Sequence, residues 1–185
     1  MPTYGANAAG SGATDGGAGV AWTDPNNITA SDDSKATVDL SIDAATEYLQ
    51  ARGFGFSVTG TDTVVGVQFD IECQDGVGSA DLASVSSVKL VKAGTQAGTD
   101  QSDSAFLPSG GDRVLTYGGA TNMWGTTITP TDVNSATFGV DFSIGGSGFL
   151  GAPASVDYIS CTVYTTAGGV VTAKVMPTLA FLGVG

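Results

Sequence analysis

Paired carboxylates are the side chains of this chain that could do chemistry most directly. Asp70 and Glu72 lie two positions apart, so an extended strand would present both on one face. Asp141 lies in a second strand-like segment and could face the same way. Two carboxyl groups that flank one bond are what glycoside hydrolysis requires. The same spacing is typical of a solvated strand face, which is the interpretation we favour, and the chain is predicted not to be an enzyme.

The chain has no histidine, which removes the commonest general base and metal ligand. A Ser-His-Asp or Cys-His arrangement within one chain is therefore excluded. The two cysteines, Cys73 and Cys161, are too few for a zinc site or a disulfide framework. Their alternating neighbours place both on inward strand faces, where they could pair. We expect two buried thiols instead, as is usual for a protein made in a cytoplasm.

Other candidate sites for ligands are weaker. Asp24, Asp32 and Asp33 cluster in one loop region, where carboxylates and carbonyls could hold Ca²⁺, but their spacing is not that of an EF-hand. A solvated loop is favoured, and no metal or cofactor is predicted. Trp22 and Trp124 could stack on sugar rings, although a tryptophan in a β-sandwich more often belongs to the core or an interface.

Composition limits the classes of partner. Eighteen acidic and six basic residues give a formal net charge of −12, which phosphate backbones and anionic lipids would repel. Neither nucleic acid nor a membrane is expected as a partner. No run approaches the roughly 18 apolar residues of a membrane span, and the first residues lack the features of a signal peptide. Charged residues make up only 13% of the chain, so Gly, Ser, Thr, Asn and Ala must cover much of the surface.

The elements that would position these residues are strands. Around Trp124 and Asp141, Phe138, Val140, Phe142 and Ile144 alternate with Gly139, Asp141 and Ser143, which predicts a half-buried strand. Similar alternation predicts strands over residues 37–42, 53–58, 63–73, 86–92 and 155–165. The residues expected to point inward include Val38, Leu40, Ile42, Phe54, Phe56, Val58, Val65, Val67, Phe69, Ile71, Val88, Leu90, Ile159 and Val163. Eight or nine short strands without an amphipathic helix predict an all-β, jelly-roll-like antiparallel β-sandwich.

The ends of the chain differ from its centre. Residues 1–20 are small and polar, so we expect a flexible N-terminal arm that orders against a neighbouring subunit, or else a disordered tail. Residues 21–166 form the predicted sandwich, and residues 167–185 a C-terminal strand or arm. The long polar connection 93–112 is a further candidate contact region. The predicted interface residues are Tyr4, Phe106, Leu107, Phe149, Leu150, Phe181 and Leu182.

A family resemblance rests on residues spread over most of the chain. The segment WTDPNNI at 22–28 resembles the N-terminal W-x-N-P signature of a β-sandwich module of tailed-bacteriophage structural proteins, with Asp24 in place of the usual Asn. The later landmarks are Tyr48-Leu49, Phe54-Gly55-Phe56, Gly66-Val67, Tyr117-Gly118-Gly119, Trp124-Gly125, Phe138-Gly139-Val140 and the closing strand from Val156 to Tyr164. Because these residues determine a fold, the resemblance carries over no catalytic site.

The resemblance implies a role in a virion. A chain with one such module and two apolar or flexible ends is similar to capsid decoration (cement) proteins, which are commonly trimers that clamp major-capsid subunits. It therefore implies a homotrimer, the major capsid protein as partner, and a place on the capsid surface after synthesis in the host cytoplasm. The alternative is a tail, baseplate or fibre module that binds a host glycan or receptor.

Overall fold

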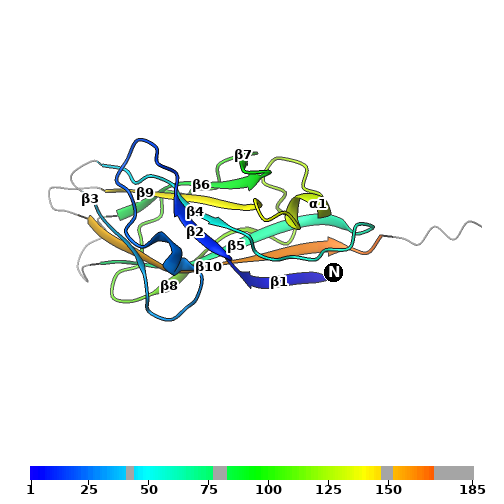
Figure 1. Cartoon of the computed structure of the whole chain (residues 1–185), viewed down its shortest axis with the longest axis horizontal. Helices are drawn as coiled ribbons and strands as arrows, with labels where there is room; N and C mark the ends of the chain where they lie inside the picture. Colours follow the sequence, from blue (N-terminus) through cyan, green and yellow to red (C-terminus); the bar gives the residue numbers. More distant parts are fainter. Residues whose placement is uncertain (41–43, 77–82, 147–151, 169–185) are drawn as a thin grey trace, which may run out of the picture.

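Ten strands and two short helices make up the part of the chain that the structure describes, a computed structural model covering residues 1–40, 44–76, 83–146 and 152–168. All strands pair antiparallel, within two sheets that pack face to face around one hydrophobic core (Figure 1). The predicted all-β antiparallel sandwich is confirmed. No described helix is long and apolar enough to cross a membrane.

The first sheet has the strand order β1-β10-β5-β8. Its strands are β1 (Thr3–Ala8), β3 (Ala36–Leu40), β5 (Thr63–Asp75), β8 (Arg113–Gly119) and β10 (Ala152–Thr166). Strands β1 and β3 share one edge of β10, with β3 along its first half and β1 along its second. This long strand is therefore paired on both sides over most of its length.

The second sheet has the order β2-β4-β9-β6-β7. Its strands are β2 (Ser11–Thr14), β4 (Leu49–Arg52), β6 (Ala83–Lys92), β7 (Thr95–Ala97) and β9 (Gly139–Gly146). Without β1 and β2, the orders β3-β10-β5-β8 and β4-β9-β6-β7 are those of an eight-stranded jelly roll, taken in chain order. The two short helices are η1 (Pro25–Ile28) and α1 (Pro130–Val133), the latter closed by a capping box between Thr129 and Asp132.

The N-terminal segment differs from the predicted arm. Strand β1 pairs with β10 in the first sheet, and β2 pairs with β4 in the second. Between them, the N–H of Ala9 donates to the carbonyl of Ile159 and the N–H of Gly10 to that of Arg52, each over 2.9 Å. The segment can be built from small residues because hydrogen bonds of its backbone, rather than buried side chains, hold it in the sheets. Residues 1–14 therefore belong to the sandwich and bridge its two sheets.

Alternation predicted inward residues well wherever the ladder is regular. Strand β3 buries Ala36, Val38 and Leu40 and exposes the residues between them; Ile42 lies outside the described residues. The prediction for Val65 is wrong, because Val64 and Val67 are buried while Val65 is half-buried. Tyr164 and Thr165 of β10 pair with Gly66 and Val64, so Val65 is the extra residue of a bulge on β5, which changes the phase.

The predicted strand over residues 53–58 is not a strand. Phe54, Phe56 and Val58 are buried as expected, but Gly53 and Gly55 have left-handed φ angles of 70° and 67°, which interrupt the regular extended conformation. The side chain of Asn134 takes the place of a neighbouring strand. Its amide donates to the carbonyl of Val58 over 2.9 Å and accepts from the N–H of Val58 over 2.8 Å.

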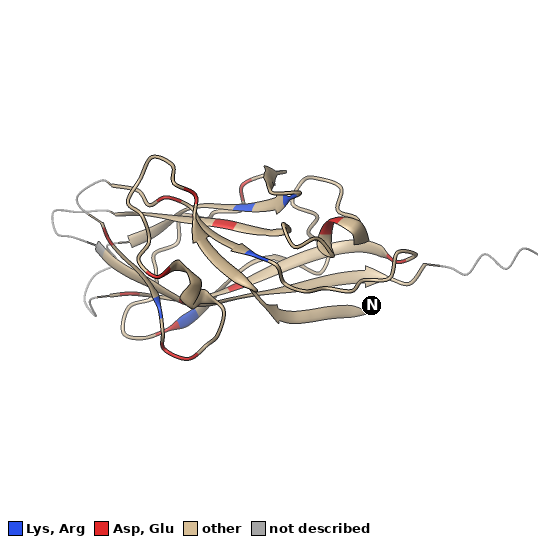
Figure 2. Cartoon of the chain, viewed as in Figure 1, with Lys and Arg blue, Asp and Glu red and all other residues tan. Residues whose placement is uncertain are grey.

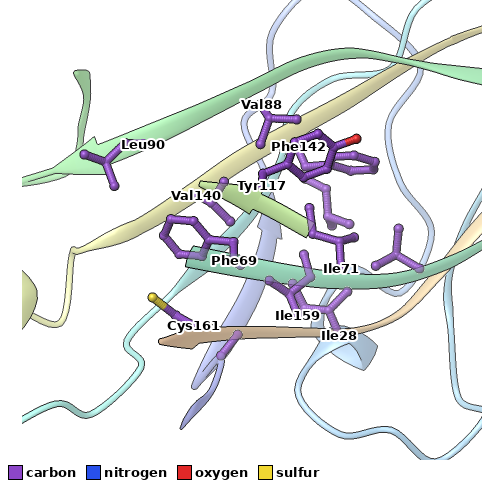
Figure 3. Close-up of a cluster of buried hydrophobic side chains, with 14 of the residues drawn as sticks. Ile28, Phe69, Ile71, Val88, Leu90, Tyr117, Val140, Phe142, Ile159 and Cys161 are labelled. Atoms are coloured by element: carbon purple, nitrogen blue, oxygen red, sulfur yellow. The ribbon is translucent and has the colours of Figure 1, made fainter. Parts of the chain in front are cut away.

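Aromatic rings form the centre of the core. Phe69 of β5 lies 5.5 Å from the ring of Trp124 in an edge-on contact, 5.6 Å from Phe54 and 6.2 Å from Phe138, measured between ring centroids. Figure 3 shows side chains of β5 and β10 meeting those of β6 and β9 from the opposite sheet. Edge-on and tilted pairs of this kind add to the stability gained from burial.

Candidate functional site

A groove of about 430 Å³ lies on the outer face of the first sheet, where β3, β10 and β5 run side by side. One row of its lining is Thr37, Ser155 and Gln74, which are register partners on the three strands. The lining is completed by Thr23, Lys35, Val38, Asp39, Gly76, Pro153 and Ala154. The groove thus offers hydroxyl, amide, carboxylate and ammonium groups and no aromatic ring, a set that suits a polar ligand.

A cluster of charged and polar side chains lies beside this groove. The Nζ of Lys35 is 2.6 Å from the Oδ2 of Asp112, and both side chains are only 17% exposed. Asp157 is almost fully buried, and neither its Oδ1 nor the Oγ of Ser155 has a hydrogen-bond partner among the described residues. Buried polar atoms without a hydrogen-bond partner are uncommon in folded proteins. Ser155 and Asp157 therefore single out this part of the surface as a candidate site.

The position of Asp157 follows from a bulge. The register of β10 against β5 shifts between Val156 and Tyr158, so Asp157 is the extra residue and lies beneath the loop that precedes β3. Burial raises the pKa of its carboxyl, and the charges of Glu72 and Asp112 act in the same direction. A backbone hydrogen bond from Asp33 and the charge of Lys35 oppose this rise.

Sequence reasoning missed Lys35, Asp112, Ser155 and Asp157. They come from three distant segments. The bulge at Asp157 interrupts the alternation, because the inward phase of Ile159 and Cys161 would place an aspartate in the core at position 157. The available signal was an aspartate within a strand otherwise made of apolar, hydroxyl-bearing and aromatic residues. Figure 2 shows why charge alone did not help, since acidic residues are scattered over the molecule with isolated basic residues among them.

The predicted carboxylate set is not assembled. Asp70 and Glu72 lie on β5 in the first sheet, whereas Asp141 lies on β9 in the second. Asp70 accepts hydrogen bonds from Gln68 and from the hydroxyl of Thr116. The three side chains therefore cannot flank one bond, and the expectation that Asp141 shares their face is wrong.

Asp141 is also not solvated. It is 3% exposed, forms an ion pair with Arg52, and accepts a hydrogen bond from Gln96 over 2.8 Å. Next to it, the hydroxyl of Tyr48 is hydrogen-bonded to that of Ser87. These polar side chains cover the outer face of the second sheet, which is why β9 is buried on both faces from Gly139 to Ile144.

Both tryptophans belong to the core. Trp22 is 4% exposed and its indole N–H donates to the carbonyl of Glu47 over 3.0 Å, while Trp124 is completely buried. Neither ring face is open for a sugar, so the favoured reading of these residues is confirmed. The landmarks Phe54, Phe56 and Phe138 are buried too, whereas Tyr164 is half-buried on the outer face and donates to Gln68.

The cysteines are free and buried, as predicted. Both point into the core, but Cys73 lies opposite Val156 on β10 and Cys161 lies opposite Phe69 on β5, several rows away. Burial raises the pKa of the Cys73 thiol to about 12, with smaller contributions from Asp112 and Glu72. Burial also raises the pKa of Cys161. Neither thiol is placed for chemistry.

The loop aspartates Asp24, Asp32 and Asp33 do not come together as a set of metal ligands. No three acidic or thiol side chains gather as metal ligands anywhere in the described ranges. Asp32 instead accepts a hydrogen bond from the N–H of Ser34 two residues on. Asp24 and Asp33 adopt left-handed backbone conformations, as aspartates in turns often do.

The predicted interface residues differ in their exposure to solvent. Phe106 is 49% exposed, as an interface residue should be. The prediction for Leu107 is wrong, because its side chain is buried in the core and its N–H donates to the carbonyl of Ala83. Tyr4 is half-buried, and its hydroxyl donates to Asp62 over 3.0 Å. The other four, Phe149, Leu150, Phe181 and Leu182, lie outside the described residues.

Comparison with known proteins gives likeness of fold. No family model matches the chain, and no curated protein sequence matches it. A solved structure described as "CBM4 structure and function" is 14% identical, covering 82% of this chain and 92% of that chain, with a TM-score of 0.41.

Two viral structures are also similar. A chain of the infectious bursal disease virus VP2 subviral particle is 16% identical, with a TM-score of 0.34, and a chain of the infectious bursal disease virus Gt strain is 14% identical, with a TM-score of 0.32. Each match covers 75% of this chain and 34% of the viral chain, so the chain spans about a third of their length. At these identities the likeness concerns the fold and transfers no ligand, partner or activity.

Proposed function

We propose that this chain is a non-enzymatic structural protein of a tailed-phage virion, which binds the shell of major capsid protein and stabilises it as a decoration protein does. The observation that carries the proposal is the jelly-roll order of β3 to β10. This architecture recurs in viral capsid and lectin domains. Its two packed sheets can serve as a rigid support for contacts made elsewhere. It also agrees with the phage-module landmarks of the sequence.

The use of the chemically capable side chains supports a structural role. Trp22 and Trp124 are buried in the core, and Asp141 forms a buried ion pair with Arg52. Asp70 is held by Gln68 and Thr116 on an open strand face. A shell-binding protein needs this kind of rigid scaffold more than it needs reactive groups.

The charge of the chain supports an outward place on a shell. A net charge of −12 is repelled by packaged nucleic acid and favours basic protein surfaces. Each contact with the shell can be weak, because attachment at many equivalent positions raises the effective affinity.

The experiment is a binding assay with shells assembled from the major capsid protein of the same phage. We expect the full chain to sediment with the shells at a fixed ratio of subunits and to raise the temperature at which they disassemble. A chain that stays in the supernatant at every concentration would contradict the proposal. Empty shells of an unrelated phage serve as the control for non-specific adhesion.

A second candidate function is binding of a glycan or another polar receptor by a tail or fibre module. The groove beside Ser155 favours it, because its lining offers several hydrogen-bonding groups to a ligand rich in hydroxyls. Glycan-array binding that is lost in Gln74→Ala and retained in the distant exposed variant Ser57→Ala would support this function over the first.

A further inference from the structure

Strand β8 is the open edge of the first sheet. It ends the strand order, and only β5 pairs with it among the described strands. Its ladder with β5 runs through seven consecutive pairs, from Val67 opposite Gly119 to Cys73 opposite Arg113, with no register shift. Val114 is 56% exposed on this strand. A regular, exposed edge is a template for pairing with another strand.

The other edges are protected in the ways that natural sheets use. Strand β7 has three residues and β2 has four. The register of β1 shifts between Tyr4 and Asn7, which interrupts its edge. Strand β3 is covered by a bridge between Thr23 and Thr37. Strand β8 has none of these devices, and it carries no carboxylate although the chain has eighteen.

The direction in which the backbone groups of β8 point can be derived from Val67 on the neighbouring strand β5. The N–H of Val67 donates to the carbonyl of Asn122, and its own carbonyl accepts from the indole of Trp124, so both groups point towards the β8 side. Since direction alternates along a strand, Phe69, Ile71 and Cys73 point the same way and bond Tyr117, Leu115 and Arg113.

It follows that the N–H and C=O groups of Val114 and Thr116 point away from the sheet. No hydrogen bond among the described residues uses them. We propose that this edge binds β8 of a second copy of the chain, antiparallel and about a two-fold axis at Leu115. Val114 of each copy then exchanges both backbone hydrogen bonds with Thr116 of the other, and the two first sheets become one.

The edge is complementary to itself in this arrangement. Arg113, its one charged residue, faces Tyr117 of the second copy, so the two guanidinium groups are not opposed. Half-buried Leu115 meets its equivalent at the axis, next to the core. On the outer face, Asp70 of one copy lies in the same cross-strand row as Glu72 of the other. Three strand spacings separate them, which is about 14 Å. That exceeds the Debye length of about 8 Å at physiological salt, so these carboxylates are largely screened there.

The association is expected to be modest and strengthened by salt. A short strand pair buries less than the roughly 1,200–2,000 Å² of stable interfaces, so it forms at high local concentration, as on a crowded surface. The net charge of −12 on each copy opposes it at low ionic strength. The proposal rests on the strand order, the register, the direction of the backbone groups and the exposure of the edge, and does not depend on the proposed function. It favours pairs over the homotrimer that the family resemblance implies.

Sedimentation velocity of the full chain, from low micromolar to near-millimolar concentration, tests the number of copies. We expect the mass to rise from one copy to two, at lower concentration in physiological than in low salt. Val114→Pro removes an outward N–H at a place where an edge tolerates proline, and should stay a single copy. Phe106→Ser removes the exposed ring elsewhere and should behave as the parent. A single copy throughout, three copies, or a pair that survives Val114→Pro overturns the proposal.

Two further readouts keep the test independent of whether Val114→Pro folds. Val114→Glu keeps every backbone group and brings a carboxylate beside the second copy, so it should weaken pairing at least tenfold and less so in high salt. Amide exchange should show Val114 and Thr116 unprotected in dilute solution and protected in concentrated solution. Leu115 and Tyr117, bonded within the sheet, should be protected in both. Equal protection of all four in dilute solution would overturn the assignment of the edge.

Discussion

The indole N–H of Trp124 donates to the backbone carbonyl of Val67 over 3.0 Å, in a fully buried hydrogen bond. It joins the connection after β8 to the middle of β5, the strand that carries Phe69 at the centre of the core. Trp124 itself holds a left-handed backbone conformation, with φ of 56°. The position of this ring therefore depends on the close approach of several backbone segments.

Trp124→Phe should destabilise the fold by about 1–3 kcal/mol, because the carbonyl of Val67 is left buried without its donor. Trp124→Ala should cost more, about 3–5 kcal/mol, since a cavity is added. Urea unfolding measures both. The exposed control Ser57→Ala should stay within about 0.5 kcal/mol of the parent, and a Phe variant as stable as that control would contradict the role of the hydrogen bond.

Gly118→Ala should be far more damaging than Gly110→Ala. Both glycines have positive φ angles, 85° and 82°, so alanine meets a similar backbone penalty of about 1–2 kcal/mol at each. At Gly118, however, a Cβ would lie 2.1 Å from the carbonyl oxygen of Val67, whereas at Gly110 it would meet nothing within 4 Å. Thermal unfolding of the two variants gives the comparison. Equal unfolding temperatures would show that the backbone around Trp124 can shift to make room for the added Cβ.

Local alternation predicted those parts of the fold in which the ladder is regular. Phe138, Val140, Phe142 and Ile144 are all buried as expected, since side chains on a strand must alternate. Bulges escaped prediction because they depend on the neighbouring strand. Val65 and Asp157 both lie where the register of β10 against β5 shifts, and the pairing of the two strands sets this shift.

The outer faces of the sheets were less predictable than the core. Asp141 has the pattern of a solvated strand residue, yet Arg52 and Gln96 from other strands cover it. Residues 1–14 have the composition of a disordered tail, yet backbone pairing with β10 and β4 fastens them. Both outcomes are set by contacts between segments far apart in the chain, which periodicity within one segment cannot express.

Asp157→Asn should make the fold more stable than the parent at neutral pH. The native pKa of Asp157 is raised, so the folded chain binds its proton more tightly than the unfolded chain does. Stability of the parent therefore falls as pH rises through the native pKa and is regained as pH falls towards the unfolded value near 4. Asparagine keeps an oxygen for the backbone N–H of Asp33 and removes the charge beside Glu72 and Asp112.

The measurement for Asp157 is the unfolding midpoint of both proteins from pH 4 to pH 8. The advantage of the variant should be greatest at neutral pH and should shrink as the solution is acidified. Asp39→Asn, on an exposed residue of the same sheet face, is the matched control and should show no such trend. A variant that is less stable than the parent at neutral pH would mean that Lys35 depends on the charge of Asp157.

Thiol titration tests the placement of Cys73 and Cys161 in the core. Both are buried and free, and burial raises the pKa of Cys73 to about 12, so almost no thiolate forms near pH 8. A thiol reagent should therefore label neither residue in the native protein. In denaturant without reductant it should label both, because burial is the only protection. Zero labelling after unfolding would reveal a disulfide. Rapid labelling of the native protein would mean that the paired strands β5 and β10 separate readily.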